Sequence, residues 1–346
     1  MIKASIIGAT GYAGIELVRL LSAHPKVDLV HLVSQSFVDQ PVSAVYPNFK
    51  GILDKICSQL DIDQISEESD IIFTSLPHST SDRIISALYE KGNRIIDLSA
   101  DFRYRSAEIY EKWYGTRHAR PDLLEASVYG LPELYREEIK QTRLIGNPGC
   151  YPTSALLPLA PLMAANAIRP DTIIIDSKSG SSGAGRSPSP GLHFCEVDEN
   201  IKAYKVACHR HTSEIEQELG IIAKHDVTVS FTPHLLPVKR GILSTIYAAL
   251  AKNLKFSDIY DIYTNFYCNE PFIVLHEEGS MPELKHVNGS NMCHIGFAVD
   301  NRTSRIIIVS AIDNLIKGAS GQAIQSMNIL FGIDETTGLL YPGWYL

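Results

Sequence analysis

The stretch "IKASIIGATGYAGIELVRLL", residues 2–21, decides the fold of the first part of this 346-residue chain. An apolar run ends in the glycine turn GATGYAG, residues 8–14, and apolar residues at helical spacing follow. Glycines let a backbone approach a pyrophosphate, and a helix N-terminus offers N–H groups and positive partial charge. The turn therefore predicts a dinucleotide site with contacts from Gly8, Thr10, Gly11, Tyr12, Ala13 and Gly14. Its spacing is GxxGxxG rather than GxGxxG, so a tight turn without a ligand is the alternative.

Strand and helix signals alternate after this turn. Apolar strand segments occupy 27–34, 69–77 and 93–100, and helical periodicity occupies 15–24 and 81–92. This βαβ rhythm predicts an α/β fold with a parallel, doubly wound Rossmann-type sheet.

The pattern changes after Cys150. A helix is expected at 153–168, followed by long β-rich segments at 171–180, 226–233, 241–250, 291–299 and 304–311. These predict a second, α+β domain with a mixed or antiparallel sheet. The segment 313–332 predicts a final amphipathic helix, with one apolar face formed by Leu315, Ala319, Ala323, Met327 and Leu330.

Charge and composition exclude several classes of protein. The net charge of −8 gives no footprint for nucleic acid or an anionic membrane, and no apolar run approaches the roughly 18 residues of a membrane helix. The N-terminus resembles a first strand more than a signal peptide. Six scattered cysteines without a CxxC pair indicate a reducing compartment, and we expect the cytoplasm.

Cofactor choice depends on the end of the second strand, where Ser34, Gln35 and Ser36 stand. NAD-binding proteins usually carry a carboxylate there for the ribose 2′-hydroxyl, so its absence favours NADP, with contacts from Ser34 and Ser36. No arginine follows to hold the 2′-phosphate, which leaves the strength of this preference open.

The segment "LIGNPGCYPT", residues 144–153, places Cys150 where a strand meets a helix. A helix N-terminus favours the thiolate, which is the nucleophilic form of cysteine. We therefore expect Cys150 to be a catalytic nucleophile, the alternative being a buried structural cysteine.

A nucleophilic cysteine needs an acid/base, and "KVACHRHTSEIEQEL", residues 205–219, offers His209 and His211. Either histidine alone is also compatible with a surface or capping role. Cys208 beside them has no second ligand pair at a usual spacing, so we expect no metal site.

Two further segments are suited to anions. "SKSGSSGAGRSPSPG", residues 177–191, carries Arg186 and fits either a loop around a cofactor or a flexible linker. "FTPHLLPVKRGIL", residues 231–243, places Lys239 and Arg240 at the start of a strand. These cations fit either a site for a negatively charged substrate or a solvated surface loop.

Together with "DNLIKGASGQAIQSMN", residues 313–328, these motifs resemble the N-acetyl-gamma-glutamyl-phosphate reductase family, which is grouped with the aspartate-semialdehyde dehydrogenases. The resemblance runs from residue 2 to about 340, and GNPGCYPT is its most specific motif. It implies NADPH-dependent reduction of N-acetylglutamyl 5-phosphate in arginine biosynthesis. It also implies a cofactor domain at 1–149 and 314–346, a catalytic and dimerisation domain at 150–313, and a homo-oligomer.

The resemblance also implies roles for single residues. Cys150 would attack the acyl phosphate, phosphate would leave, and His209, preferred to His211 on its place in the HRH motif, would be the acid/base. Further cofactor contacts would come from Gly183, Arg186, Asn314, Gly318 and Asn328, and substrate contacts from Arg103, Asn147, Lys205, His211 and Arg240. Family members often carry arginine where Gln35 stands, so this chain departs from the family pattern at a position expected to contact the 2′-phosphate.

Several readings stay open. A sister enzyme acting on aspartyl phosphate would place other neighbours around the cysteine, and a phosphorylating aldehyde dehydrogenase would run the reaction oxidatively. A non-catalytic cofactor sensor would need neither Cys150 nor His209. A carrier-linked substrate would want a basic patch such as Lys202, Lys205 and Arg210, although we favour the free substrate. Dimer and tetramer are not distinguished.

Overall fold

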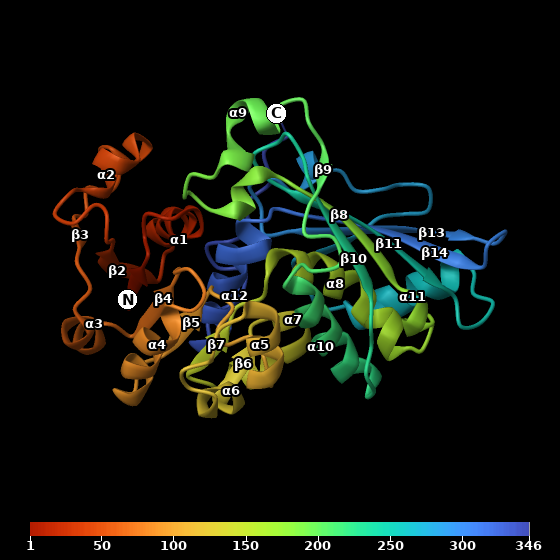
Figure 1. Ribbon diagram of the computed structural model, residues 1–346, viewed down its shortest axis with the longest axis horizontal. Coiled ribbons are helices and arrows are strands. Elements are labelled where there is room, and N and C mark those ends of the chain that lie inside the picture. The colour runs from red at the N-terminus through yellow and green to blue at the C-terminus, as the bar shows by residue number, and fades with distance from the viewer. Residues whose placement is uncertain (346) are drawn as a thin grey trace. The chain divides into compact units, whose positions relative to one another are not determined.

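The structure, a computed structural model, describes residues 1–345 and divides into two compact units (Figure 1). Unit 1 comprises Met1–Pro148 and Ala319–Leu340. Unit 2 comprises Gly149–Gly318 and the C-terminal segment that begins at Tyr341. The chain thus returns to unit 1 later than the predicted boundary at 314. The last segment packs with unit 2, where the backbone N–H of Trp344 donates to the backbone carbonyl oxygen of Asn288 at 2.6 Å.

Unit 1 is built on one sheet of seven parallel strands in the order β3-β2-β1-β4-β5-β7-β6. The strands are β1 (Ile2–Ile7), β2 (Val27–Val33), β3 (Cys57–Ser58), β4 (Ile71–Thr74), β5 (Ile95–Asp97), β6 (Ser127–Tyr129) and β7 (Leu144–Gly146). The predicted parallel, doubly wound sheet is confirmed. Every residue of β4 and β5 is buried, as expected for central strands of a parallel sheet.

Helices connect these strands. They are α1 (Tyr12–Ser22), α2 (Val42–Val45), η1 (Pro47–Phe49), α3 (Ile62–Glu68), α4 (Ser81–Glu90), α5 (Ala107–Tyr114), α6 (Asp122–Ala126) and α7 (Pro132–Ile139). The short strands β3 and β6 were missed from the sequence, because two or three residues carry no detectable alternation.

Unit 2 is built on a seven-stranded mixed sheet in the order β12-β13-β14-β11-β8-β10-β9, which confirms the predicted sheet type. Its strands are β8 (Ile174–Ser179), β9 (Lys202–Ala203), β10 (Ser230–Leu235), β11 (Ile242–Ala249), β12 (Ile273–Leu275), β13 (Cys293–Asp300) and β14 (Arg305–Ile312). Its helices are α8 (Cys150–Ala164), η2 (Pro170–Thr172), η3 (Ser181–Ala184), η4 (Pro190–Leu192), α9 (Phe194–Val197), α10 (His211–Ala223), α11 (Phe256–Phe266) and η5 (Leu284–His286).

A final helix does occupy part of the predicted segment 313–332, but its predicted bounds and its amphipathic character were wrong. The chain forms a π-helical turn, η6 (Ile316–Ser320), and then the shorter α12 (Gly321–Leu330), whose residues 321–329 are all buried. Its polar side chains bond within unit 1 rather than to water: Gln322 donates to the Gly130 carbonyl at 3.1 Å, and Gln325 donates to Glu335 at 2.8 Å. A polar face therefore did not indicate exposure here.

Two buried carboxylates lie at the carboxyl end of β5, where Asp97 is the last residue of the strand and Asp101 follows it. Asp97 accepts from the Thr74 hydroxyl at 2.8 Å and the Ser99 hydroxyl at 2.6 Å, and Asp101 accepts from the Tyr110 hydroxyl at 2.8 Å. Burial, followed by the charge of Asp101, raises the pKa of Asp97 to about 6. The folded chain therefore holds this proton more tightly than the unfolded chain does.

This pKa predicts a pH-dependent stability difference. Because the folded-state pKa is raised, the stabilisation by Asp97 is complete below its unfolded pKa and is lost as pH rises through about 6. Asp97→Asn removes this titration. As the pH rises from about 5 to 7.5, the wild type should lose roughly 1–2 kcal/mol of unfolding free energy that the variant keeps, so the variant gains this amount relative to the wild type. Urea unfolding at both pH values measures the gain. Asp28→Asn, an exposed carboxylate on β2, is the control, and an equal gain there would contradict the assignment.

Candidate active site

The glycine turn of unit 1 closes tightly on itself. The Gly8 and Ala9 N–H groups donate to the Val33 carbonyl oxygen, each at 3.0 Å, and Gly8 has φ +89°. A Cβ atom at Gly8 would lie 2.3 Å from the Ser75 carbonyl oxygen, and one at Gly14 would lie 2.1 Å from the Gly8 carbonyl oxygen. Gly8 is therefore required by the close approach of the segment that follows β4, and Gly14 by the packing of α1 against the turn.

Gly11 has a different environment. It is the N-cap of α1, no side chain caps this end, and the first turn, which includes Tyr12 and Ala13, carries no acidic residue. A Cβ atom at Gly11 would meet only the Gly8 carbonyl oxygen, at 3.6 Å. An uncapped helix start with open space at its glycine fits the pyrophosphate of a dinucleotide.

The end of β2 carries hydroxyl groups where NAD-binding proteins carry a carboxylate. Ser34 is buried, and its hydroxyl lies 2.9 Å from that of Thr10, whose carbonyl oxygen accepts from the Tyr46 hydroxyl at 2.9 Å. Gln35 and Ser36 are exposed. The side chain of Ser34 is thus used inside the turn, whereas Ser36 is accessible to a ribose phosphate.

Asn328 does not present its amide to a ligand. Its oxygen lies 3.1 Å from His24 Nε2, and its nitrogen donates to the carbonyl oxygens of Glu335 and Thr337 at 3.2 and 2.9 Å. The residue is fully buried. Asn328 therefore anchors the segment after α12 in unit 1. Its amide does not make the cofactor contact expected from the sequence.

The turn formed by Gly149 and Cys150, named the nucleophile turn after the predicted role of Cys150, lies in unit 2. Cys150 is half-buried and is the first residue of α8, directly after its N-cap Gly149. The Gly149 N–H donates to the carboxylate of Glu214 at 2.8 Å, and Glu214 is fully buried on α10. A Cβ atom at Gly149 would lie 2.6 Å from His211 Nε2, so the imidazole of His211 packs directly on this turn.

Gly318 packs against the same cysteine. A Cβ atom at Gly318 would lie 2.8 Å from the Cβ atom of Cys150. The resemblance implied a cofactor contact for Gly318. In the structure a glycine is needed at position 318 for packing, because any side chain there would displace Cys150.

His209 is buried in an aromatic environment. Its ring centroid lies 5.5 Å from that of Tyr151, 5.6 Å from that of Tyr204 and 5.4 Å from that of Phe231. The backbone N–H of His211 donates to His209 Nδ1 at 3.2 Å, so the neutral His209 ring carries its proton on Nε2. Burial, and then the charges of Lys205 and Arg210, lower the pKa of His209 to about 3. Both predicted histidines are thus brought to the residues flanking Cys150.

Tyr151 and Tyr204 form a hydrogen-bonded pair beside His209, with their hydroxyl oxygens 3.0 Å apart. Burial raises the pKa of both, that of Tyr204 to about 12, so both remain protonated donors at neutral pH. The sequence analysis missed this pair and Glu214. A signal for Glu214 existed, because it follows His211 by three residues and so shares a helix face with it.

The predicted cations differ in their surroundings. Lys205 is mostly exposed, and partial burial of its side chain, followed by the charge of Arg210, lowers its pKa. Arg240 instead pairs with buried Asp313 at 3.2 Å and lies over the Trp344 ring. Lys205 is therefore the better placed of the two for a substrate phosphate.

Two predicted substrate residues lie in unit 1. The Arg103 guanidinium donates to the carbonyl oxygens of Asn147 and Leu98 at 2.6 and 3.0 Å, which fixes the segment before the nucleophile turn. Asn147 is fully buried, and among the described residues its side-chain oxygen has no hydrogen-bond partner. That oxygen is therefore a buried acceptor whose hydrogen-bonding capacity the described residues do not use.

The remaining predicted cofactor residues lie in unit 2. Asn314 accepts from the Gly241 N–H at 2.8 Å and donates to the Ser182 hydroxyl at 3.0 Å, which joins two loops. Gly183 and Arg186 are exposed on and after η3.

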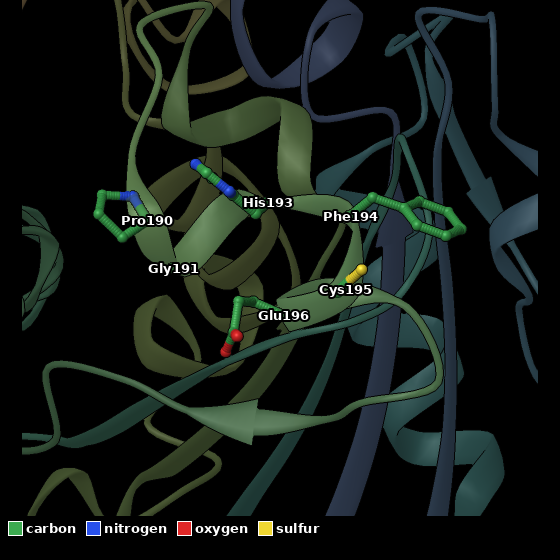
Figure 2. A pocket seen from close by; sticks show the side chains of 6 residues that line it. All are labelled: Pro190, Gly191, His193, Phe194, Cys195 and Glu196. Atoms are coloured by element: carbon green, nitrogen blue, oxygen red, sulfur yellow. The ribbon is translucent and has the colours of Figure 1, made fainter.

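A surface pocket lies elsewhere in unit 2, at η4 and α9 (Figure 2). It is lined by Pro190, Gly191, His193, Phe194, Cys195 and Glu196, and the Phe194 ring points away from Pro190. None of the predicted catalytic or binding residues lines it, so we do not assign the chemistry to this pocket.

Family comparisons agree with the two units. Residues 3–142 match the family described as semialdehyde dehydrogenase, NAD binding domain, and residues 150–314 match the semialdehyde dehydrogenase, dimerisation domain. The chain is thus a semialdehyde dehydrogenase-type oxidoreductase with an NAD(P)-binding domain and a dimerisation domain.

Full-length relatives narrow this class. The chain is 53% identical over 346 residues to N-acetyl-gamma-glutamyl-phosphate reductase of Acetivibrio thermocellus, covering 100% of both chains. It is 54% identical over 345 residues to the reductase of the same name from Caldicellulosiruptor saccharolyticus, again covering 100% of both. The chain belongs to the N-acetyl-gamma-glutamyl-phosphate reductase family.

Solved structures show the same fold. Aspartate semialdehyde dehydrogenase II of Vibrio cholerae, complexed with ASA, superposes with TM-score 0.74 at 17% identity over 96% of this chain and 98% of that chain. Aspartate semialdehyde dehydrogenase with NADP from Candida albicans gives 0.71 at 18% identity over 96% and 98%. Among the described residues, no helix has the length and apolar character needed to cross a bilayer.

The contact between Gly318 and Cys150 predicts a matched pair of variants. Gly318→Ala should lower kcat/KM about 100-fold, because even a small displacement of a nucleophile is costly. Gly191→Ala is the control, since its Cβ atom would meet only Lys202 Nζ, at 3.8 Å. Steady-state kinetics on both folded variants measures the difference. Unchanged kcat/KM in Gly318→Ala would show that the contact does not position the cysteine.

Proposed function

We propose that the chain reduces N-acetyl-L-glutamyl 5-phosphate to N-acetyl-L-glutamate 5-semialdehyde with NADPH, releasing phosphate, through a thioester on Cys150. This is a step of arginine biosynthesis, and we place it in the cytoplasm. The observation that carries the proposal is the nucleophile turn, where Cys150 starts α8 and the His211 imidazole packs on Gly149. The full-length relatives support the substrate by their name.

The first half of the reaction makes the acyl enzyme. His209 accepts the thiol proton of Cys150, the thiolate sulfur bonds to the acyl carbon, and the carbon–oxygen bond to phosphate breaks. The positive charges of Lys205 and Arg210 stabilise the departing phosphate. Backbone N–H groups in the first turn of α8 stabilise the oxyanion that forms during the attack.

The second half releases the aldehyde. When bound, NADPH supplies a hydride to the thioester carbon. The resulting thiohemiacetal then loses the Cys150 thiolate as its oxygen deprotonates, and the aldehyde leaves. His209 exchanges the proton in this half as well, and the phenol pair of Tyr151 and Tyr204 keeps its ring in place.

Electrostatics make His209 responsive to the substrate. Without ligand, burial and two cations lower the pKa of His209 to about 3, so the ring is neutral, with its proton on Nε2 and its Nδ1 accepting from the backbone N–H of His211. His209 accepts the thiol proton at Nδ1 once this hydrogen bond opens. A phosphate dianion beside Lys205 and Arg210 offsets their charge and raises this pKa, which strengthens the base when substrate is bound.

Within this proposal unit 1 binds the cofactor and unit 2 carries the chemistry and the contact with a second copy. The uncapped start of α1 holds the pyrophosphate. The absence of a carboxylate at Ser34, Gln35 and Ser36 supports NADP over NAD. We place the enzyme as a homo-oligomer, in line with the match to a dimerisation domain.

Aspartyl phosphate is the second candidate substrate, since structural neighbours of the same fold are aspartate semialdehyde dehydrogenases. The relatives at more than half identity over the full chain favour the N-acetylglutamyl compound. A free rather than carrier-linked substrate is proposed.

The reverse reaction tests the function without an unstable acyl phosphate. The protein should reduce NADP⁺ in the presence of N-acetylglutamate 5-semialdehyde, and the rate should depend on inorganic phosphate, which the acyl enzyme needs as acceptor. Cys150→Ala should have only trace turnover. Phosphate-independent reduction, or retained turnover in Cys150→Ala, would contradict the thioester route. Reduction with aspartate semialdehyde instead would change the substrate.

The two histidines can be separated by substitution. His209→Asn should reduce kcat roughly 10²–10⁴-fold, the usual contribution of a general acid/base, and flatten the pH profile. His211→Asn should act mainly on KM, because His211 is proposed to bind substrate. The roles would be exchanged if the larger loss of kcat and the altered pH profile appeared in His211→Asn.

Cofactor selectivity should respond to Gln35. An arginine at this exposed position would form a charge-assisted bond to the 2′-phosphate, so Gln35→Arg should tighten NADPH binding about tenfold and leave NADH binding unchanged. Fluorescence titration with both nucleotides measures this, and Gln35→Leu is the uncharged control. Equal tightening of NADH would place the arginine away from the 2′ position.

A further inference from the structure

Three histidines of unit 2 converge at one end of its sheet. His276 follows β12, His286 ends η5, and His294 is the second residue of β13. Each offers a ring nitrogen, and these three atoms all lie within 4.8 Å of one another. All three side chains are half-buried. The cluster includes none of the residues proposed for catalysis or cofactor binding.

The hydrogen bonds of the cluster already orient two of the rings. His276 Nδ1 lies 2.9 Å from the Ser280 hydroxyl, which can accept its proton and leave Nε2 as an acceptor. His276 Nε2 lies 3.1 Å from His294 Nδ1. His276 thus has the arrangement of a metal-binding imidazole whose other nitrogen is fixed by an outer hydrogen bond, whereas His294, which donates from Nδ1 here, has to move that proton to Nε2 when an ion binds.

We propose that His276, His286 and His294 bind one divalent transition-metal ion, Zn²⁺ or a chemically similar ion, with a fourth position left to water. Imidazole nitrogen is a preferred ligand of Zn²⁺, with bonds of about 2.0–2.1 Å. At a tetrahedral angle such bonds place two nitrogens about 3.4 Å apart, close to the spacing of His276 and His294. The spacing of the three along the chain, with nine and seven residues between them, matches no short zinc motif, so the sequence predicted no metal.

His286 has to rearrange when the ion binds. Its Nδ1 accepts from the Glu283 N–H at 3.2 Å, and its ring is stacked with that of Tyr345, with centroids 6.4 Å apart. A neutral ring that binds metal through Nε2 carries its proton on Nδ1, so the Glu283 contact must open. The ion would thereby connect β13, the loop after β12 and η5. The site is expected to stabilise this part of unit 2 rather than to take part in hydride transfer.

Metal titration of the full-length protein tests the proposal. After chelator treatment and dialysis, calorimetric titration with ZnCl₂ should show one saturable ion per chain, and Co²⁺ should give the visible absorption of a low-symmetry, four-coordinate site. His294→Gln and His276→Gln should each weaken binding on the order of 100-fold or more. His193→Gln, an exposed histidine of the same unit, should leave it unchanged.

Two controls keep the result specific. The double variant Cys150→Ser/Cys208→Ser lacks the thiols near His209 and His211 that could also bind zinc. The same titration of this variant should still show one bound ion per chain. Circular dichroism without metal confirms that each variant is folded, and His286→Gln is a further ligand variant if another fails. Absence of saturable binding, binding only at millimolar zinc, or equal binding by the histidine variants would overturn the proposal.

Discussion

The hydrogen bond from the Gly149 N–H to the Glu214 carboxylate fixes the geometry on which the proposed chemistry depends. It ties the start of α8 to α10, so the first residue of one helix and the histidine one turn before Glu214 on the other are held together. Gly149 itself has no Cβ atom, which lets the His211 imidazole pack on the turn. A buried carboxylate requires such a donor, because an unpaired charge in the interior is strongly destabilising.

Electrostatics around this turn suit the anionic substrate proposed for the chain. His209 is neutral because it is buried and has two cations beside it, and the same cations attract a phosphate. Under the proposed function, substrate binding and activation of the base are therefore coupled through charge. The Tyr151–Tyr204 pair, protonated at neutral pH, supplies a donor next to the ring without adding a negative charge that would repel phosphate.

The sequence predicted the parts of the fold that have strong local signals and missed those set by tertiary contacts. The glycine turn and the apolar strands led to the correct parallel sheet, and proline and glycine around Cys150 marked the start of α8. Glu214 resembled a surface residue of a polar helix, because nothing local shows that its partner is a backbone N–H 65 residues away in sequence. The polar side of α12 was misjudged for the same reason, since its partners lie in distant loops. The histidine cluster depends on strand pairing that no spacing rule covers.

The covalent intermediate at Cys150 is the central claim, and trapping it is the most direct test. The protein is incubated with N-acetylglutamyl 5-phosphate in the absence of NADPH, and intact-mass and peptide mass spectrometry follow an acid quench. The account predicts release of one phosphate per chain and one N-acetylglutamyl group on Cys150, discharged as aldehyde when NADPH is added. Phosphate release without an adduct, or an adduct on exposed Cys208 that NADPH does not discharge, would contradict it.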